Sequence, residues 1–415
     1  MRIEKSSYYL LSGALFCFFL TWSFSFSLFS IWLKQVISLS GEQIGMVFSI
    51  NAVAALLVMP FYGLIQDKLG LKKQLLYVIA VTLILMGPFF VYIYAPLLTS
   101  NFYLAASLGG LVFAIAFSAG IGVLETYIER AGRAVGFEFG KARMWGSLGW
   151  ALATFFSGSL LNLNPNYNFW LSSLCGAAFL ILIVFVNTQS LVKVHDEFNG
   201  VSTAPKLHDI VGLFKLPQFW QFIVFVLGVT CIYSVYDQQF PIYFSSLFPT
   251  EEEGNVTYGY LNSFQVFLEA GGMFVAPFIV NKIGAKNGLI LSGAIMAIRM
   301  IGSGFADDVI FISAMKLLHA VELPILLVAI FKYIAINFDK RLSSSIYLVG
   351  FLVFSQVGAS ILSVGIGTLY DNIGFAASYK ILGSIVAIFT FISIFILKNS
   401  SEKHQSIELV EETAC

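Results

Sequence analysis

The chain has 415 residues, of which 58% are hydrophobic, 16% aromatic and only 11% charged, and its formal net charge at pH 7 is zero. A composition this apolar excludes an ordinary soluble domain, so lipid must be the solvent for most of the chain. Because neither charge is in excess, we expect no nucleic acid and no strongly charged macromolecule as a partner.

About twelve apolar runs follow one another, each near the roughly 20 residues that a membrane-crossing helix needs. Their approximate ranges are 8–33, 45–65, 74–96, 103–128, 144–162, 168–187, 218–245, 258–280, 288–305, 310–335, 344–369 and 376–397. The first run follows Arg2 and Lys5 but is too long for a signal peptide, so we interpret it as a retained membrane helix. The predicted fold class is an all-α membrane protein with twelve transmembrane helices.

The basic residues are distributed unevenly between the two sets of connections. Eighteen of the 23 Lys and Arg residues fall on the side of the N-terminus, whereas only Lys34 and Lys380 fall on the other side. That other side carries acids instead, among them Glu251–Glu253. Because short cytoplasmic loops retain Lys and Arg, both termini of this multi-pass chain are predicted to be cytoplasmic.

The longest polar connection divides the runs six and six. It predicts a six-helix bundle over 1–187, a cytoplasmic linker over 188–217, a second six-helix bundle over 218–397 and a cytoplasmic tail over 398–415. A repeat supports the division: it comprises Gly63, Asp67, Lys68, Gly70, Lys72 and Lys73 after the second run, and Pro277, Asn281, Lys282, Gly284, Lys286 and Asn287 after the eighth. One copy alone is equally a charged turn that caps two helices, but two copies favour a duplicated, pseudo-symmetric transporter fold.

Glu125, at the end of the fourth run, and Arg143, at the start of the fifth, are the first charges within apolar runs. A salt bridge at the membrane border is one interpretation of this pair. Trp150 favours another, because it lies seven residues after Arg143 and so on the same helix face. An indole packs against the C–H face of a pyranose ring, while a carboxylate and a guanidinium bind its hydroxyl groups. The three residues together predict a sugar site.

The tenth run carries three titratable residues on one helix face. Lys316, His319 and Glu322 recur every three residues, so they must point into the bundle. Lys316 and Asp237 of the seventh run predict a buried ion pair that fixes helix packing, with a functional role as the alternative. For His319 two interpretations stay open, a hydrogen-bonded core residue and a partner for a sugar hydroxyl.

Glu322 is predicted to carry a proton. Its neighbours Leu323–Leu326 are apolar, and apolar surroundings favour the protonated carboxyl over the charged carboxylate. Arg299 of the ninth run can favour proton release, because a guanidinium stabilises the carboxylate once water enters.

The sequence contains no sign of metal, nucleotide or disulfide chemistry. Its four cysteines, Cys17, Cys175, Cys231 and Cys415, are far apart, and there is neither a metal-spaced Cys/His cluster nor a phosphate-binding glycine loop. We therefore expect no metal site, no cofactor and no enzyme activity, and we exclude an ATP-driven pump for this chain on its own.

Several stretches resemble the oligosaccharide and proton symporters of the major facilitator superfamily, the group that contains the lactose, raffinose and sucrose permeases. The turn Gly63–Lys73 resembles the signature of the superfamily. The more specific stretches are Phe137–Arg143, Tyr236–Gln239 and His319–Pro324, and the resemblance extends over nearly the whole chain. It implies two six-helix bundles, proton-coupled sugar transport and a bacterial inner membrane as the location.

The resemblance also implies a role for each candidate residue. The family's sugar-binding acid, arginine and tryptophan match Glu125, Arg143 and Trp150. Its proton-coupling group matches Arg299, His319 and Glu322, with Tyr233 as a neighbouring tyrosine, and its interhelical charge pair matches Asp237 and Lys316. Glu322 is implied to be the carboxyl that takes and gives the proton.

Departures from the lactose permease pattern resemble the sucrose permeases. The lactose permease has an acid on helix eight at the position of Val266, whereas the acid here is Glu269, three residues further on the same face. It also has a charged pair where this chain has Ser234 and Ser355, and losing both partners avoids an orphaned buried charge. The stretch Tyr260–Val266 is also similar to the sucrose permeases.

The sequence therefore predicts a symporter that imports a disaccharide with a proton, with sucrose favoured and melibiose, raffinose or lactose as the alternatives. Glu269 and His319 complete the predicted sugar-binding set. The expected partners are the disaccharide, the proton as coupling ion and the lipid bilayer, and a monomer contains a full pathway. Two other functions are a sugar receptor, which lacks a soluble output domain here, and an uncoupled facilitator, whose uptake would never exceed equilibrium.

Overall fold

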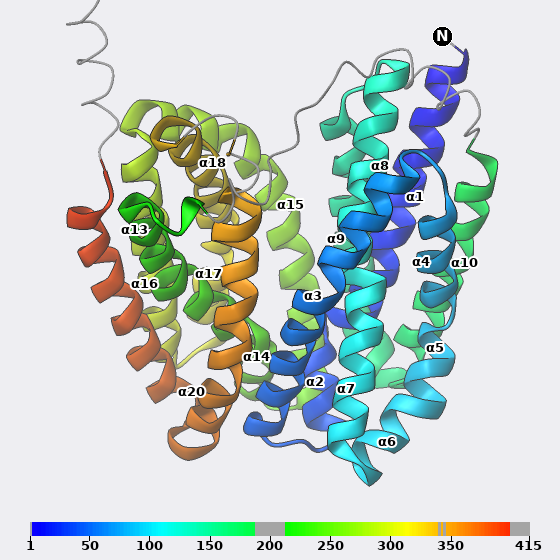
Figure 1. Ribbon diagram of the computed structural model, residues 1–415. Helices are drawn as coiled ribbons and strands as arrows, with labels where there is room; N and C mark the ends of the chain where they lie inside the picture. Colours follow the sequence, from blue (N-terminus) through cyan, green and yellow to red (C-terminus); the bar gives the residue numbers. More distant parts are fainter. Residues whose placement is uncertain (1, 187–211, 339–341, 343–345, 399–415) are drawn as a thin grey trace, which may run out of the picture. The chain divides into compact units, whose positions relative to one another are not determined.

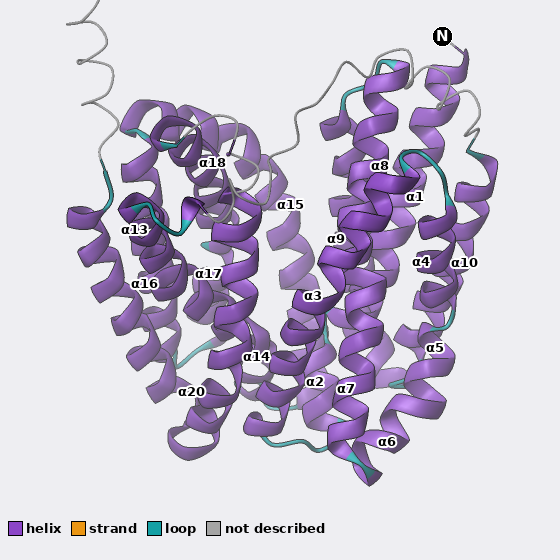
Figure 2. Cartoon of the chain, viewed as in Figure 1, coloured by secondary structure: helices purple, strands orange, loops and turns teal. Residues whose placement is uncertain are grey.

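The computed structural model describes residues 2–186, 212–338, 342 and 346–398. Within these ranges the chain is helical and has no strand (Figure 2). Most of the predicted linker 188–217 and nearly all of the predicted tail 398–415 lie outside the described residues.

The helices of the first half of the chain alternate with short connections (Figure 1). They are α1 (Arg2–Phe26), α2 (Phe29–Gln35), α3 (Gly41–Leu69), α4 (Gln74–Ile84), α5 (Met86–Pro88), α6 (Ala95–Ser100), α7 (Phe102–Phe113), α8 (Ala119–Val135), α9 (Phe139–Leu163) and α10 (Tyr167–Phe185), with π-helical turns at Phe89–Tyr94 and Ala114–Ser118. A capping box starts α3, because the Ser40 hydroxyl accepts a hydrogen bond from the Gln43 N–H and the Gln43 side chain accepts one from the Ser40 N–H.

The second half of the chain is organised in the same way. Its helices are α13 (Pro217–Phe225), α14 (Ile232–Ser246), α15 (Glu251–Ile283), α16 (Ala285–Gly304), α17 (Val309–Leu317), α18 (His319–Asn337) and α20 (Phe354–Ile396), with π-helical turns at Val226–Cys231 and Ile346–Val353. α13 begins with Pro217, whose fixed φ suits the first helical position.

The twelve predicted spans are present. Among the described residues, nine helices are long and apolar enough to cross a membrane, and the pair Gln74–Ile84 and Met86–Ser100, bent by 45°, makes a tenth. α9 is not among these, and the stretch Ile346–Ile396 is counted once although Gly374 breaks it with a φ of 76°. Including α9 and dividing that stretch at Gly374 gives the twelve helices of an all-α membrane protein.

Several predicted helix boundaries are wrong, and two of them concern the candidate site: α8 and α9 extend further than the apolar runs 103–128 and 144–162. The added residues are charged, and an amphipathic helix continues where hydropathy falls: Arg133 and Glu129, four residues apart, form an ion pair of 2.6 Å. Glu125 therefore lies ten residues before the end of α8 and Arg143 four residues after the start of α9, inside the helices and not at their border.

The chain forms two compact units that interleave in sequence. The first unit comprises Met1–Ser202, Asp237–Phe267 and Ser360–Asn372, and the second comprises Thr203–Tyr236, Leu268–Ala359 and Ile373–Cys415. Parts of α14, α15 and α20 thus belong to the first unit although they come from the second half of the sequence. The predicted domain boundaries at 187 and 218 stay a prediction.

The core of the first unit is built by helix pairs. α1 packs against α9 and α10, α3 against α7, and α4 against α10 (Figure 1). Gly149 of α9 shows how closely α1 approaches, because a Cβ there would lie 2.4 Å from the carbonyl oxygen of Phe16. Close backbone approach through small residues is how membrane helices gain packing energy without a hydrophobic driving force.

A carboxylate joins two helices of the first unit that are far apart in sequence. Asp371 of α20 accepts hydrogen bonds from the N–H groups of Gly41 and Glu42, each 2.8 Å long, at the start of α3. A helix N-terminus leaves these N–H groups without helical partners and carries a partial positive charge, so a carboxylate is a favourable partner there.

In the second unit, α16 packs against α17 and α18, and α18 contacts the π-helical turn Ile346–Val353. Gly284 starts α16 with a φ of 87°, and Gly70, its counterpart in the predicted repeat of the first half, has a φ of 57°. A positive φ favours glycine, so both connections require this residue for the same reason.

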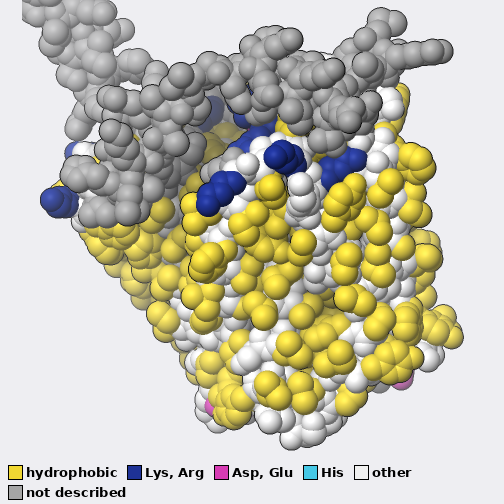
Figure 3. Space-filling model, turned by 45° about the vertical axis from the view of Figure 1, so that its right-hand side comes forward, with side chains coloured by type: hydrophobic (Ala, Val, Ile, Leu, Met, Phe, Trp, Pro, Cys, Tyr) yellow, Lys and Arg dark blue, Asp and Glu magenta, His cyan; other side chains and the backbone are white. Residues whose placement is uncertain are grey.

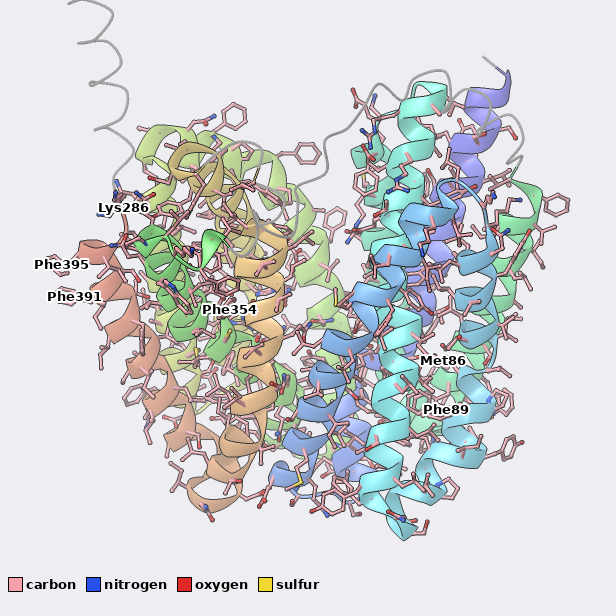
Figure 4. The ribbon with its side chains drawn as sticks, viewed as in Figure 1. Met86, Phe89, Lys286, Phe354, Phe391 and Phe395 are labelled. Carbon is pink, nitrogen blue, oxygen red and sulfur yellow. The ribbon has the colours of Figure 1, made fainter. Side chains whose placement is uncertain are left out.

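The surface of the helices suits a lipid surrounding. Figure 3 shows hydrophobic side chains over the flank in view and Lys and Arg side chains gathered along its upper edge. Phe391 and Phe395 of α20 are 61% and 72% exposed and point away from their helix (Figure 4). Large apolar side chains exposed along membrane spans are expected where acyl chains replace water.

Candidate functional site

The first unit contains an arginine–glutamate pair on neighbouring helices. Arg143 Nε of α9 donates a hydrogen bond of 2.5 Å to Glu125 Oε1 of α8. The two side chains are 34% and 32% exposed, so water reaches both. The predicted pairing of these residues is thus observed, and both retain free faces for further hydrogen bonds.

Aromatic rings surround this pair. The Arg143 guanidinium lies 4.4 Å from the centroid of the Phe19 ring of α1, a cation–π contact. Phe19 lies 6.4 Å from the ring of Trp150, which connects the predicted tryptophan to the arginine. Trp22 of α1 meets Trp150 edge to face at 5.5 Å. The structure therefore brings Glu125, Arg143 and Trp150 into one cluster, which we call the sugar cluster after the role that the sequence predicts for it.

Phe19 and Trp22 were not predicted to belong to this cluster. Both lie in the first apolar run, where a phenylalanine or tryptophan has no feature that separates a site residue from a lipid-facing one. Trp22 also stacks on Phe117 at 5.6 Å with 7° between the ring planes, and the Ser23 hydroxyl donates to the Trp150 carbonyl at 3.0 Å. These contacts hold the Trp150 segment of α9 against α1.

The second unit contains the other acid–arginine pair. Arg299 Nη1 of α16 donates to Glu322 Oε1 of α18 at 3.0 Å, and neither side chain has any exposed surface. His319 Nδ1 lies 2.9 Å from the same Glu322 oxygen and 3.2 Å from Arg299 Nη1. The predicted group of Arg299, His319 and Glu322 is therefore assembled around one carboxylate oxygen, and we call it the coupling cluster after the role that the sequence predicts for it.

Tyr233 joins the coupling cluster as expected. Its hydroxyl is in hydrogen-bond contact with His319 Nδ1, and its ring lies 5.0 Å from the Arg299 guanidinium. A ring nitrogen carries either one proton or one lone pair, so Nδ1 can pair strongly with only one of its three neighbours at a time. Which of Tyr233, Arg299 and Glu322 pairs with Nδ1 depends on which of these groups carry protons.

The second oxygen of Glu322 has a different environment. Oε2 is buried and has no hydrogen-bond partner among the residues that the structure describes. A buried carboxylate oxygen without a donor is costly. The two oxygens of this carboxyl therefore have different surroundings, one beside the Arg299 guanidinium and one without a donor among the described residues.

The remaining predicted residues lie in different units. Asp237 of α14 belongs to the first unit and Lys316 of α17, only 3% exposed, belongs to the second, so their pairing stays a prediction. Glu269 of α15 is half-buried in the second unit, as His319 is. Their place beside the sugar cluster stays a prediction as well.

Within the described ranges, no group of three or more His, Cys, Asp or Glu side chains could hold a metal ion.

Comparison with known proteins gives full-length matches. The protein-family model described as LacY proton/sugar symporter matches residues 1–410. The sucrose permease of Escherichia coli is 40% identical over 401 residues, which cover 96% of each chain. The raffinose permease of Escherichia coli is 40% identical over 409 residues, 98% of this chain and 96% of the relative. The lactose permease of Citrobacter freundii is 41% identical over 374 residues, 90% of each.

Solved structures show the same fold at low sequence identity. The nucleoside transporter NupG superposes with a TM-score of 0.76 at 15% identity, covering 96% of this chain and all of the other. A D-xylose-proton symporter superposes with a TM-score of 0.67 at 14% identity, covering 96% and 98%. The architecture is the major facilitator fold.

Proposed function

The chain belongs to the LacY proton/sugar symporter family, and we propose that it imports sucrose together with a proton across a bacterial inner membrane. The protein is a multi-pass membrane transporter and not an enzyme, because its relatives over nearly the full length are permeases. Sugar and H⁺ are its substrates as a member of this family.

Overall identity does not select the sugar, because the sucrose, raffinose and lactose permeases are all 40–41% identical to this chain. Individual positions support sucrose. Ser234 and Ser355 stand where the lactose permease pattern has a charged pair, and the helix-eight acid is Glu269 in place of an acid at Val266. Sucrose is therefore the substrate that we propose.

The main support for the proposed sugar site is the Glu125–Arg143 pair, which is about one-third exposed and lies in one cluster with the Trp150 indole. In our proposal the Trp150 ring packs against the apolar face of one sugar ring. Glu125 and Arg143 bind hydroxyl groups of that ring with their free faces. Glu269 and His319 complete the sugar-binding set of this proposal, as the sequence predicts.

Glu322 carries the proton in this proposal. It is protonated while the site is open to the outside, and the two halves of the fold then rock so that the site opens to the cytoplasm. Sugar leaves first and the proton second, because Arg299 stabilises the carboxylate that remains. His319 and Tyr233 respond to the proton through Nδ1.

The coupling supplies enough energy for accumulation. A proton that moves inward through 100 mV releases about 2.3 kcal/mol. This supports roughly fortyfold sugar accumulation from the electrical term alone, since about 1.4 kcal/mol corresponds to a factor of ten. A pH gradient adds to this ratio.

The proposed orientation places both termini in the cytoplasm. The basic residues on the side of the N-terminus and the acids of Glu251–Glu253 on the other side support it. One chain contains both clusters, so we propose a functional monomer.

Uptake of radiolabelled sucrose by energised, transport-deficient bacteria tests the substrate. Unlabelled melibiose, raffinose and lactose serve as competitors, and a protonophore serves as the coupling control. We expect concentrative sucrose uptake that collapses with the protonophore. Accumulation of melibiose or lactose with no sucrose uptake would overturn the sucrose assignment.

A substitution at Glu322 tests the coupling. Glu322→Ala should abolish uphill uptake and spare the exchange of internal for external sugar, because exchange requires no net proton movement. Glu129→Ala is the matched control, since Glu129 forms an exposed ion pair with Arg133. Undiminished accumulation by Glu322→Ala would show that another group carries the proton.

A further inference from the structure

A short polar segment of α15 lies in the first unit and has no role in the mechanism above. Asn262 and Gln265 are three residues apart, so their side chains are neighbours on the helix surface. They are only 7% and 3% exposed. Buried amide groups in a membrane span are unfavourable unless partners satisfy their polar atoms.

The packing of α15 against α9 places this segment near the level of Trp150. A Cβ on Gly158 would lie 2.2 Å from the carbonyl oxygen of Asn255, and one on Gly259 would lie 2.7 Å from that of Thr154. At this contact α15 therefore runs antiparallel to α9. Starting from the contact between Thr154 and Gly259, a step of four residues covers about 6 Å of helix axis. This step leads to Trp150 on α9 and to Ser263, between the two amides, on α15.

The two amides have different partners. Asn262 Nδ2 donates to Thr154 Oγ1 at 3.3 Å, and this contact attaches the segment to α9 one turn from Trp150. Gln265 Oε1 is buried without a hydrogen-bond partner in the part of the chain that the structure describes. A buried acceptor without a donor destabilises the folded state, and a ligand hydroxyl would satisfy it.

We propose that the amides of Asn262 and Gln265 form a second, uncharged subsite of the sugar site. It binds hydroxyl groups of the sugar ring that the Glu125–Arg143 pair does not hold. A hydroxyl both donates and accepts, and an amide presents a donor and an acceptor side by side. Such a site rejects a sugar that lacks the matching hydroxyl, because a buried polar group is then left unpaired. The subsite therefore sets selectivity among disaccharides, and this inference rests on the proposed sugar transport.

The test is a binding series on the purified full-length protein in detergent, with calorimetry of sucrose and its monodeoxy analogues. The variants are Gln265→Met, which keeps the side-chain length and removes the amide, and Gln265→Glu, which keeps an acceptor. Asn168→Leu is the control, because Asn168 is a buried amide of α10 that donates to the Ser157 carbonyl at 2.9 Å. It removes a buried amide of another helix, α10, which lies outside the proposed subsite on α15.

We expect Gln265→Met to weaken sucrose binding about tenfold, the effect of one lost hydrogen bond. The deoxy analogue that lacks the contacted hydroxyl should bind the wild type about tenfold more weakly than sucrose does. On Gln265→Met, that analogue and sucrose should have equal affinities. Gln265→Glu should restore part of the discrimination. Asn168→Leu should keep the wild-type profile across all analogues.

Two results would overturn the subsite. One is a Gln265→Met variant that retains the wild-type affinity and analogue profile. The other is a uniform loss of affinity for all analogues, which indicates a packing role. If the wild type binds no sucrose, the substrate proposal fails separately, and the deoxy analogues of the disaccharide that it does bind decide the role of the amides.

Discussion

The two acid–arginine pairs of this protein differ most in their contact with solvent. Glu125 and Arg143 are about one-third exposed, whereas Glu322 and Arg299 have no exposed side-chain surface. Water screens the first pair, so hydroxyl groups can replace its hydration at little cost. In the second pair a charge must remain paired or be neutralised by a proton. The same two residue types therefore suit binding in one place and proton coupling in the other.

The largest expected effect comes from breaking the buried pair. Arg299→Leu leaves Glu322 buried without its guanidinium, so the free energy of unfolding should fall by about 3–5 kcal/mol. Replacing both residues by leucine should recover most of this loss, because no charge is then left unpaired. Denaturant unfolding of the purified protein in detergent measures both changes.

Arg133→Leu provides the control for this comparison. Arg133 pairs with Glu129 at the surface and is 72% exposed, so its removal should change the free energy of unfolding by less than about 1 kcal/mol. A double variant as unstable as Arg299→Leu alone would contradict the role of the unpaired carboxylate.

The partly exposed pair should show the reverse behaviour. In our proposal Glu125→Gln removes a charged hydrogen bond to the sugar of about 1.5–3 kcal/mol, so sugar affinity should fall by about 10- to 100-fold. The free energy of unfolding should change by less than about 1 kcal/mol, because the pair is solvated. Calorimetric titration and denaturant unfolding of one preparation measure both quantities. A large loss of stability with unchanged affinity would make this pair a packing element.

A smaller effect is expected at the aromatic part of the sugar cluster. In our proposal Trp150→Leu removes the ring that packs against the sugar, a contribution of about 0.5–1.5 kcal/mol, so sugar affinity should fall by about 2- to 10-fold. Trp170→Leu is the control, since Trp170 is 41% exposed on α10. Equal affinities of the two variants would exclude Trp150 from the site.

The smallest effect is expected at the edge of the coupling cluster. Tyr233→Phe removes the hydroxyl that contacts His319, and Tyr236→Phe removes one that bonds the Ser303 hydroxyl at 3.0 Å. Each should lower the free energy of unfolding by about 1 kcal/mol. Only Tyr233→Phe should lower the ratio of accumulated to external sugar in energised cells. The same ratio in both variants would remove Tyr233 from the coupling cluster.

The sequence by itself determined the spans and the charged residues inside them, because hydropathy is a local property of each run. It also placed Arg143 and Trp150 on one helix face, since seven residues make nearly two turns. The family likeness added Tyr233 and the role that it implies for each candidate residue. These features depend on positions within one helix or on motifs along the chain.

Only the tertiary structure decided what depends on packing between helices. It brought Phe19 and Trp22 of α1 to the sugar cluster. It also directed Arg299 to one oxygen of Glu322 and left the other buried without a donor among the described residues. It also extended α8 and α9 past their apolar runs. Rotations and distances between helices far apart in sequence follow from the packing of the whole unit, and no local pattern encodes them.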